Sequence, residues 1–424
     1  MATPRKKKKI APPSDRRKLE VTKTYFDKFS LTARKMLQYV GVDPAFYDSF
    51  TKKQKREMMV AKYDLPKVYV KKGHCVPRQY MKLIQHQINF FIKETFVGDP
   101  SIGLRYGDYI TMGIGFTTWI SSMRDKPSAH TEMFELIHTT HERHYDGEES
   151  SFRQFMNNLQ SLTYYISKIN IRIYGFIWNG WGLKGCGVTN PFYITSTDAQ
   201  SSYFDYHGTT HKAFEIGIGN YIEDKPLWLT LPFNAAITSS TDTRRLKLFI
   251  QSHALLRMKE RMDSLSPGNR NAELIQTLSR RDTIQTENGR FYFKFIDSKH
   301  GLLGYLPFTI IKDSLYILSF IPLCSDRVPE GEALCKLLNI TRVDMMFLGM
   351  DKLSFYQYTD FDAIPNLKNA LIKAGMWHLT EIKPEVTIQG REVGKSTGVI
   401  ARFFQELIPQ LNKEEVFEEI AQMY

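Results

Sequence analysis

Residues 252–262 read SHALLRMKERM, and this stretch decides how the surrounding chain is read. The apolar side chains Leu255, Met258 and Met262 recur at helical spacing, with Ala254 at the edge of the stripe that they form. Such a stripe is typical of a helix that packs one face against a core. We therefore expect an amphipathic helix that buries these positions.

A row of basic side chains runs beside the stripe. His253, Arg257 and Arg261 follow one another at intervals of four residues, so they lie along one side of the predicted helix. Like charges at this spacing repel by a few tenths of a kcal/mol, and Glu260 relieves that only in part. A guanidinium binds phosphate through two hydrogen bonds and keeps its charge at physiological pH. The row predicts a surface for nucleic acid; alternatively, His253 packs locally and the arginines form structural salt bridges.

The neighbouring segments predict two helices and three strands. The first helix is expected to span residues 246–265, and a second to span 271–282, NAELIQTLSRRD. The segments GRFYFKFID, GLLGYLPFTII and SLYILSFIPL read as three consecutive strands, with Asp313 in the turn between the last two. Residues 250–322 should therefore fold as two helices on an antiparallel sheet of at least three strands.

This order resembles the RelE/ParE-like toxin superfamily. The shared features are the motif His-Ala-x-x-Arg-Met-x-x-Arg at residues 253–261, a short second helix, and Gly289-Arg290 before three strands. The likeness is closest to uncharacterised families of that superfamily that begin with such a helix, and it covers about residues 250–322, under a fifth of the chain. RelE-type members cleave ribosome-bound messenger RNA with basic and tyrosine side chains on the sheet. The resemblance implies RNA binding and an endoribonuclease activity.

Candidate catalytic residues lie on the first of these strands. Arg290, Tyr292 and Lys294 are two residues apart, so they share one strand face and form a cation–phenol–cation row. Lysine or arginine could stabilise developing charge, and Tyr292 or His300 could transfer a proton. We expect this row on the sheet face that the helices leave open.

The N-terminus is strongly basic. The net charge of the chain is +12, and residues 1–24 contain nine lysines and arginines against Asp15 and Glu20. With its paired prolines, this segment is predicted to be a disordered arm that attaches to a polyanion. The arm residues expected to bind nucleic acid are Lys6, Lys7, Lys8, Lys9, Arg16 and Arg17.

The remaining chain predicts an α+β protein. We expect a helical N-terminal domain at residues 25–168, in which Ser30 caps a helix that Gly41 ends. A β-rich middle region follows at 169–245, then the RelE-like module at 246–322. A small α/β region at 323–424 should contain a hairpin at 342–358 and helices near 364–374 and 398–422.

Several classes of site are not supported. The four cysteines include no C-x-x-C pair, so neither a zinc ribbon nor a disulfide framework is expected. His138, His141 and His144 do not share one helix face, and GREVGKSTG at 390–398 has three residues between its glycines where a P-loop has four. No metal or cofactor is predicted. The chain has no run of 18 apolar residues, so we expect a cytoplasmic protein without membrane contact.

Two functions remain open. The first is a nucleic-acid-associated protein of a mobile element or phage, with RNA a better candidate than DNA and with RNA cleavage by the RelE-like module as its extension. The second is a non-enzymatic structural or assembly protein, in which the basic arm is an electrostatic tether to an acidic protein.

Overall fold

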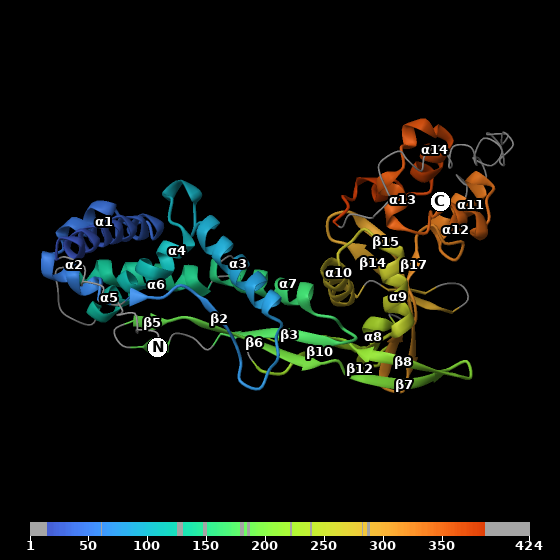
Figure 1. Ribbon diagram of the computed structural model, residues 1–424, viewed down its shortest axis with the longest axis horizontal. Helices are drawn as coiled ribbons and strands as arrows, with labels where there is room; N and C mark the ends of the chain where they lie inside the picture. Colours follow the sequence, from blue (N-terminus) through green and yellow to red (C-terminus); the bar gives the residue numbers. More distant parts are fainter. Residues whose placement is uncertain are drawn as a thin grey trace, which may run out of the picture. The chain divides into compact units, whose positions relative to one another are not determined.

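The computed structural model describes residues 15–60, 62–124, 130–146, 151–178, 182–184, 187–220, 223–237, 240–281, 283–285 and 289–385. The fold is mixed α+β, as predicted (Figure 1). The chain divides into two compact units: unit 1 is Met1–Gln160 with Phe176–Ile194, and unit 2 is Ser161–Gly175 with Thr195–Tyr424. The predicted β-rich region 169–245 therefore contributes residues to both units.

Unit 1 is largely helical. Its helices are α1 (Asp15–Tyr39), α2 (Lys52–Met58), α3 (Arg78–Glu94), α4 (Tyr106–Asp108), α5 (Ile114–Met123), α6 (Thr131–Asp146) and the first part of α7 (Ser151–Ile166). Its short strands are β1 (Lys62–Tyr63), β2 (Lys67–Val70), β4 (Gly182–Lys184) and β5 (Gly187–Thr189), while β3 (Arg172–Trp178) and β6 (Pro191–Asp198) run through both units. Phe50 stacks on Phe134 with ring centroids 6.1 Å apart, and both rings belong to the helical core.

Helix α1 corrects two expectations. It begins at Asp15, so residues 15–24, which include Arg16 and Arg17, are helical rather than part of a disordered arm. Ser30 is not an N-cap, because it lies within α1 and its hydroxyl donates to the carbonyl of Phe26 at 2.8 Å. The predicted end is confirmed, since Gly41 adopts a left-handed φ of 76° just after the helix.

Unit 2 is built on one large sheet. Among the described residues the sheet has nine strands, with the order β13-β14-β15-β16-β12-β8-β7, and β11 and β17 pair with β12 and β15. The strands are β7 (Ser201–Tyr206), β8 (Thr209–Glu215), β11 (Thr230–Pro232), β12 (Arg245–Gln251), β13 (Thr283–Gln285), β14 (Phe291–Asp297), β15 (Gly301–Ile311), β16 (Ser314–Ile317) and β17 (Ile321–Pro322). The pairing of β12 with β16 is parallel, whereas β12 with β8 and β14 with β15 are antiparallel. A separate pair joins β9 (Gly217–Ile218) to β10 (Leu227–Trp228).

Residues 250–322 contain the two helices and three strands that were predicted. The helices are α9 (Ser252–Arg261) and α10 (Pro267–Arg280), and β14, β15 and β16 form an antiparallel meander with Asp313 in the last turn. The predicted helix at 246–265 is wrong in its first part, because residues 246–251 belong to strand β12. Since β12 lies between β8 and β16, Leu246, Leu248 and Ile250 are buried with the two-residue period of a strand. The segment is thus part of a larger sheet.

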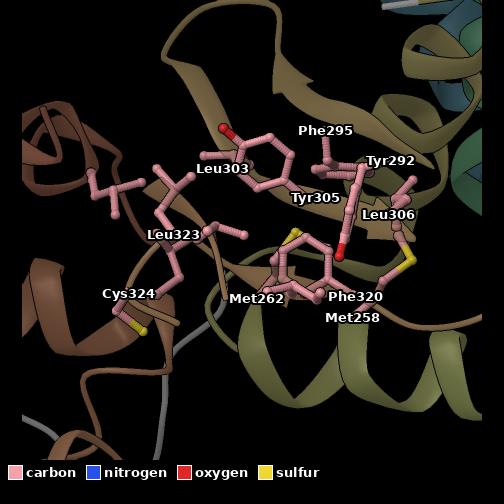
Figure 2. Packing of buried hydrophobic residues seen from close by; sticks show 14 of the residues in the cluster. Met258, Met262, Tyr292, Phe295, Leu303, Tyr305, Leu306, Phe320, Leu323 and Cys324 are labelled. Atoms are coloured by element: carbon pink, nitrogen blue, oxygen red, sulfur yellow. The ribbon is translucent and has the colours of Figure 1, made fainter. Parts of the chain in front are cut away.

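Helix α9 packs on this sheet through the predicted stripe. Ala254, Met258 and Met262 are buried, and Leu255 packs partly buried against the same core. Ala254 therefore lies inside the stripe rather than at its edge. Figure 2 shows Met258 and Met262 beside Tyr292 and Phe320 within the core of unit 2.

The C-terminal region is helical where a hairpin was predicted. Residues 342–358 form α12 (Arg342–Leu348) and α13 (Leu353–Tyr358). The backbone of Thr341 donates to the carboxylate of Asp344 at 2.8 Å, and the Thr341 hydroxyl accepts from the Asp344 backbone, which is a capping box that starts α12. Gly349, with a φ of 74°, ends the helix.

The other helices of unit 2 are α8 (Phe233–Ala236), α11 (Pro329–Leu338) and α14 (Pro365–Lys373). Helix α14 confirms the prediction near residues 364–374. The helix predicted at 398–422 and the glycine-rich segment 390–398 lie outside the described residues. Within the described part of the chain, no helix has the length and apolar character needed to cross a bilayer.

Candidate nucleic-acid interface

The predicted basic row lines a pocket in unit 2. His253, Arg257 and Arg261 of α9 face a cavity of about 150 Å³. Two further arginines, Arg327 and Arg342, line the same cavity. Arg327 lies in the loop before α11, and Arg342 is the first residue of α12. We call this cavity the arginine pocket.

The outer end of the row is held by a local ion pair. The Nη1 of Arg257 donates to Oε2 of Glu260 at 2.8 Å, and its Nε donates to Nε2 of His253 at 3.4 Å. Both partners of the ion pair remain partly exposed. The solvent around them limits the contribution of this pair to roughly 0–1 kcal/mol, so Arg257 remains able to contact a ligand.

Arg261 is held more firmly. Its guanidinium forms an ion pair with Asp351, and the exposed fractions of the two side chains are 13% and 9%. Burial lowers the pKa of Arg261, and the neighbouring charges of Arg257 and Arg342 lower it further. Because the three guanidiniums line one cavity, their like charges repel, and an anion between them would relieve that repulsion.

Arg327 and Arg342 are the free cations of the site. Both side chains are exposed, and neither forms an ion pair with any residue that the structure describes. Because they come from different segments, the pocket presents guanidiniums from α9, from the loop before α11 and from α12. Such converging donors can contact several oxygens of one phosphate at once.

The charge balance of the arginine pocket is positive. Four arginines and one carboxylate, Asp351, line it, which gives a formal charge of +3 with His253 neutral. Glu260 offsets one charge from just outside the lining. The site therefore carries an excess of positive charge that an external anion would neutralise.

The predicted catalytic row is not an open surface. Tyr292 is 5% exposed, and its ring extends from β14 toward Met258 in the core (Figure 2). Lys294 is partly buried on the same strand, and Arg290 is exposed just before β14 begins. Tyr292 belongs to the same buried cluster as Met258 of α9, so its phenol does not meet a solvent-exposed substrate (Figure 2).

His300 does not line the arginine pocket. His300 is 2.8 Å from a carboxylate oxygen of Asp297 through its Nδ1, in the turn between β14 and β15. Lys6, Lys7, Lys8 and Lys9 lie outside the described residues.

The histidine-rich segment of α6 makes hydrogen bonds inside unit 1. Nδ1 of His138 is 2.9 Å from the hydroxyl of Ser121, and Nε2 of His141 is 2.8 Å from the hydroxyl of Tyr109. In the part of the chain that the structure describes, no three histidine, cysteine or carboxylate side chains are grouped so that they could hold a metal ion.

The sequence predicted three of the five basic residues that line the arginine pocket. The spacing of His253, Arg257 and Arg261 indicated a row, and the structure brings that row to one cavity. It missed Arg327 and Arg342, because their segment was assigned to a separate region and residue 342 to a hairpin. The only sequence signal concerned Arg342. No acidic residue lies four positions from it, so it has no ion-pair partner at that helical spacing.

Comparison of the chain with protein-family models, with curated proteins and with solved structures finds no match.

Proposed function

We propose that unit 2 binds the phosphate backbone of a nucleic acid in the arginine pocket. The observation that carries the proposal is the lining itself, in which four guanidiniums face one carboxylate. Phosphate contacts from arginine supply most of the affinity of nucleic-acid binding proteins and make it sensitive to salt. The resemblance of residues 250–322 to RelE-type modules favours RNA over DNA as the ligand.

The architecture of the site supports this proposal. Arg261 is fixed by Asp351, so its guanidinium is held in place before a ligand arrives. Arg327 and Arg342 are exposed at the rim, where they can meet successive phosphates. A fixed inner cation with accessible outer cations reduces the ordering cost of binding.

We propose that the chain binds RNA, and that the predicted row of Arg290, Tyr292 and Lys294 does not cleave it. The phenol of Tyr292 is enclosed in the core, so it does not orient a ribose hydroxyl on the surface. Arg290 is exposed and Lys294 is partly buried, so these two cations are suited to holding a phosphate.

One observation favours the second candidate, a non-enzymatic assembly protein. Arg257 and Arg261 both have intramolecular carboxylate partners, as structural salt bridges would. In that case the arginine pocket would accept acidic side chains of another protein. Whether the isolated chain binds RNA therefore distinguishes the nucleic-acid-binding function from the assembly function.

The test measures the affinity of the full chain for a fluorescent single-stranded RNA of about 12 nucleotides, a typical site size, by anisotropy. The double variant Arg327→Gln/Arg342→Gln should bind about 10- to 100-fold more weakly, because it loses two charge-assisted contacts. The matched control, Lys299→Gln/Lys383→Gln, removes the same charge from exposed positions outside the pocket lining and should change affinity by about twofold at most. If RNA affinity falls equally in both variants, the arginine pocket contributes no more than nonspecific electrostatic attraction. If the wild-type chain does not bind RNA at low salt, the proposal is contradicted.

A further inference from the structure

The arginine pocket has a buried inner wall and an exposed rim. The inner wall is formed by side chains that are each less than a tenth exposed: Phe320, Ile321, Cys324, Met345 and Asp351. Arg261 completes this wall, with its side chain 13% exposed. Arg327 and Arg342 are exposed at the rim. A ligand must therefore extend inward past the rim in order to contact Arg261.

The cavity has room for a phosphate group but not for a whole nucleotide. Its volume is about 150 Å³, well above the roughly 10–15 Å³ that holds one water molecule. Pockets that enclose an entire small-molecule ligand have volumes of about 300–1,000 Å³. We therefore expect one compact anionic group inside the cavity and the rest of the ligand outside it.

The inner guanidiniums have hydrogen-bond donors to offer such a group. A guanidinium carries five N–H donors, and the ion pair with Asp351 is made by Nη1 of Arg261. Arg257 also lines the cavity, and its ion pair with Glu260 is at the surface. Because Phe320 and other apolar side chains lower the local dielectric constant, hydrogen bonds from these cations to an anion are stronger here than in water.

The end of a nucleic-acid strand fits this shape better than its interior. An internal phosphate is a diester with one negative charge, and the sugars on both of its sides keep it at the rim. A terminal phosphate is a monoester, which is attached on one side only and carries a charge of about −1.5 to −2 at pH 7. It can enter the cavity first, and its greater charge is better matched to the excess of positive charge in the lining.

We propose that the arginine pocket binds the terminal phosphate monoester of an RNA strand. This inference rests on the proposed phosphate binding and specifies which phosphate enters the pocket. Arg257 and Arg261 bind the terminal group, while Arg327 and Arg342 at the rim contact the next phosphate of the strand. The rim contacts favour a nucleic acid over a phosphorylated protein, because every unit of a nucleic acid adds a further phosphate.

The test measures by anisotropy the binding of the full chain to single-stranded RNA of about 12 nucleotides with an internal fluorophore. Three forms of one sequence are compared: one with a phosphate at the 5′ end, one with a phosphate at the 3′ end, and one with hydroxyls at both ends. Two further probes are an RNA whose terminal phosphate is blocked as a methyl diester and a peptide with one phosphoserine.

We expect at least one end-phosphorylated RNA to bind about tenfold more tightly than the hydroxyl form, because it gains charge-assisted hydrogen bonds. The end that gives this gain identifies the source of the phosphate. Blocking that phosphate as a methyl diester should remove most of the gain. This comparison uses the wild-type chain, so it does not depend on the folding of any variant.

Arg261→Lys tests the inner wall without changing the net charge. Lysine lacks the planar fork of donors, so the preference for the phosphorylated RNA should fall to about threefold or less. Affinity for the hydroxyl form should stay within about twofold of the wild type. Arg257→Gln should also lower the preference, and the surface location of its ion pair protects the fold. The matched control Arg280→Lys, at an exposed position outside the lining, should keep the wild-type preference, and circular dichroism checks the fold of each variant.

The outcomes separate this inference from the proposed function. If both end-phosphorylated RNAs bind within about twofold of the hydroxyl form, the inference is refuted, whereas weaker binding by Arg327→Gln/Arg342→Gln still supports phosphate binding. A gain that a folded Arg261→Lys leaves unchanged also refutes the inference, because the phosphate then does not reach the inner wall. If the phosphoserine peptide binds and no RNA does, both proposals fail and the pocket belongs to a phosphorylated protein partner.

Discussion

The substitution Asp351→Asn tests the inner wall of the arginine pocket. It keeps the shape of the side chain but removes the charge that faces Arg261, whose side chain is 13% exposed. Breaking a buried ion pair from one side costs about 3–5 kcal/mol, because the remaining charge is left without compensation. Residual solvent contact places our expectation near the lower end, about 3 kcal/mol. With a urea slope of roughly 1–3 kcal/mol per molar, the midpoint of unit 2 should fall by about 1–3 M.

The assay must follow each unit separately, because a chain with two compact units need not unfold in one step. Hydrogen exchange with mass spectrometry at increasing urea reports peptides of α9 and of α3 in the same sample. Asp313→Asn is the matched control: its pair with Arg244 is at the surface, where the Asp313 side chain is 77% exposed. It should change stability by less than about 1 kcal/mol.

The variant also links stability to ligand binding. Inorganic phosphate should stabilise Asp351→Asn more than the wild type, because the substitution leaves the pocket more positive and a bound anion adds to stability by mass action. A stability of Asp351→Asn within about 1 kcal/mol of the wild type would refute the buried ion pair. An equal phosphate effect on both proteins would refute the claim that this pair forms a wall of an anion site.

Three further predictions concern the core of unit 2. Tyr292→Ala should lower the free energy of unfolding, measured by urea titration, by about 3–5 kcal/mol. RNA affinity at low denaturant, measured by anisotropy, should be unchanged; if the folded variant loses RNA binding, Tyr292 contacts the ligand after all. Gly304→Ala should cost about 1–3 kcal/mol, because its new Cβ would lie 2.4 Å from the carbonyl oxygen of Ile321; an unchanged urea midpoint would contradict that packing. Burial raises the pKa of Glu273, and the charge of Asp297 raises it further, so the contribution of Glu273 to stability should be greatest below the ordinary glutamate pKa and should decline as pH rises through the shifted value. Glu273→Gln should remove that decline, and an identical pH profile of unfolding in both proteins would rule it out.

The sequence predicted local structure well where periodicity and turn chemistry agreed. The α9 stripe of Met258 and Met262, the β14–β15–β16 meander and the end of α1 at Gly41 all follow from patterns a few residues long. The prediction of secondary structure was wrong where a short apolar run is compatible with either a strand or a helix. Residues 246–251 form a central strand, and their flanking by β8 and β16 depends on pairings with distant segments.

The same limit explains the candidate site. A row on one helix, such as Arg257 and Arg261, is visible in the sequence because its spacing is local. Arg327 and Arg342 join it only through the packing of their segments within unit 2, which no local pattern contains. Tyr292 was misplaced for a related reason: strand alternation predicts which residues share a face, but it does not tell which face α9 covers.

The salt dependence of RNA binding tests the central claim most directly. For a single strand, the slope of log K against log salt is about −0.7 for each phosphate neutralised. Between about 50 and 200 mM salt, Arg327→Gln/Arg342→Gln should bind with a slope shallower than that of the wild type by roughly 1.4, while Lys299→Gln/Lys383→Gln should retain the wild-type slope. A slope unchanged by loss of the two pocket arginines would contradict phosphate binding at the arginine pocket.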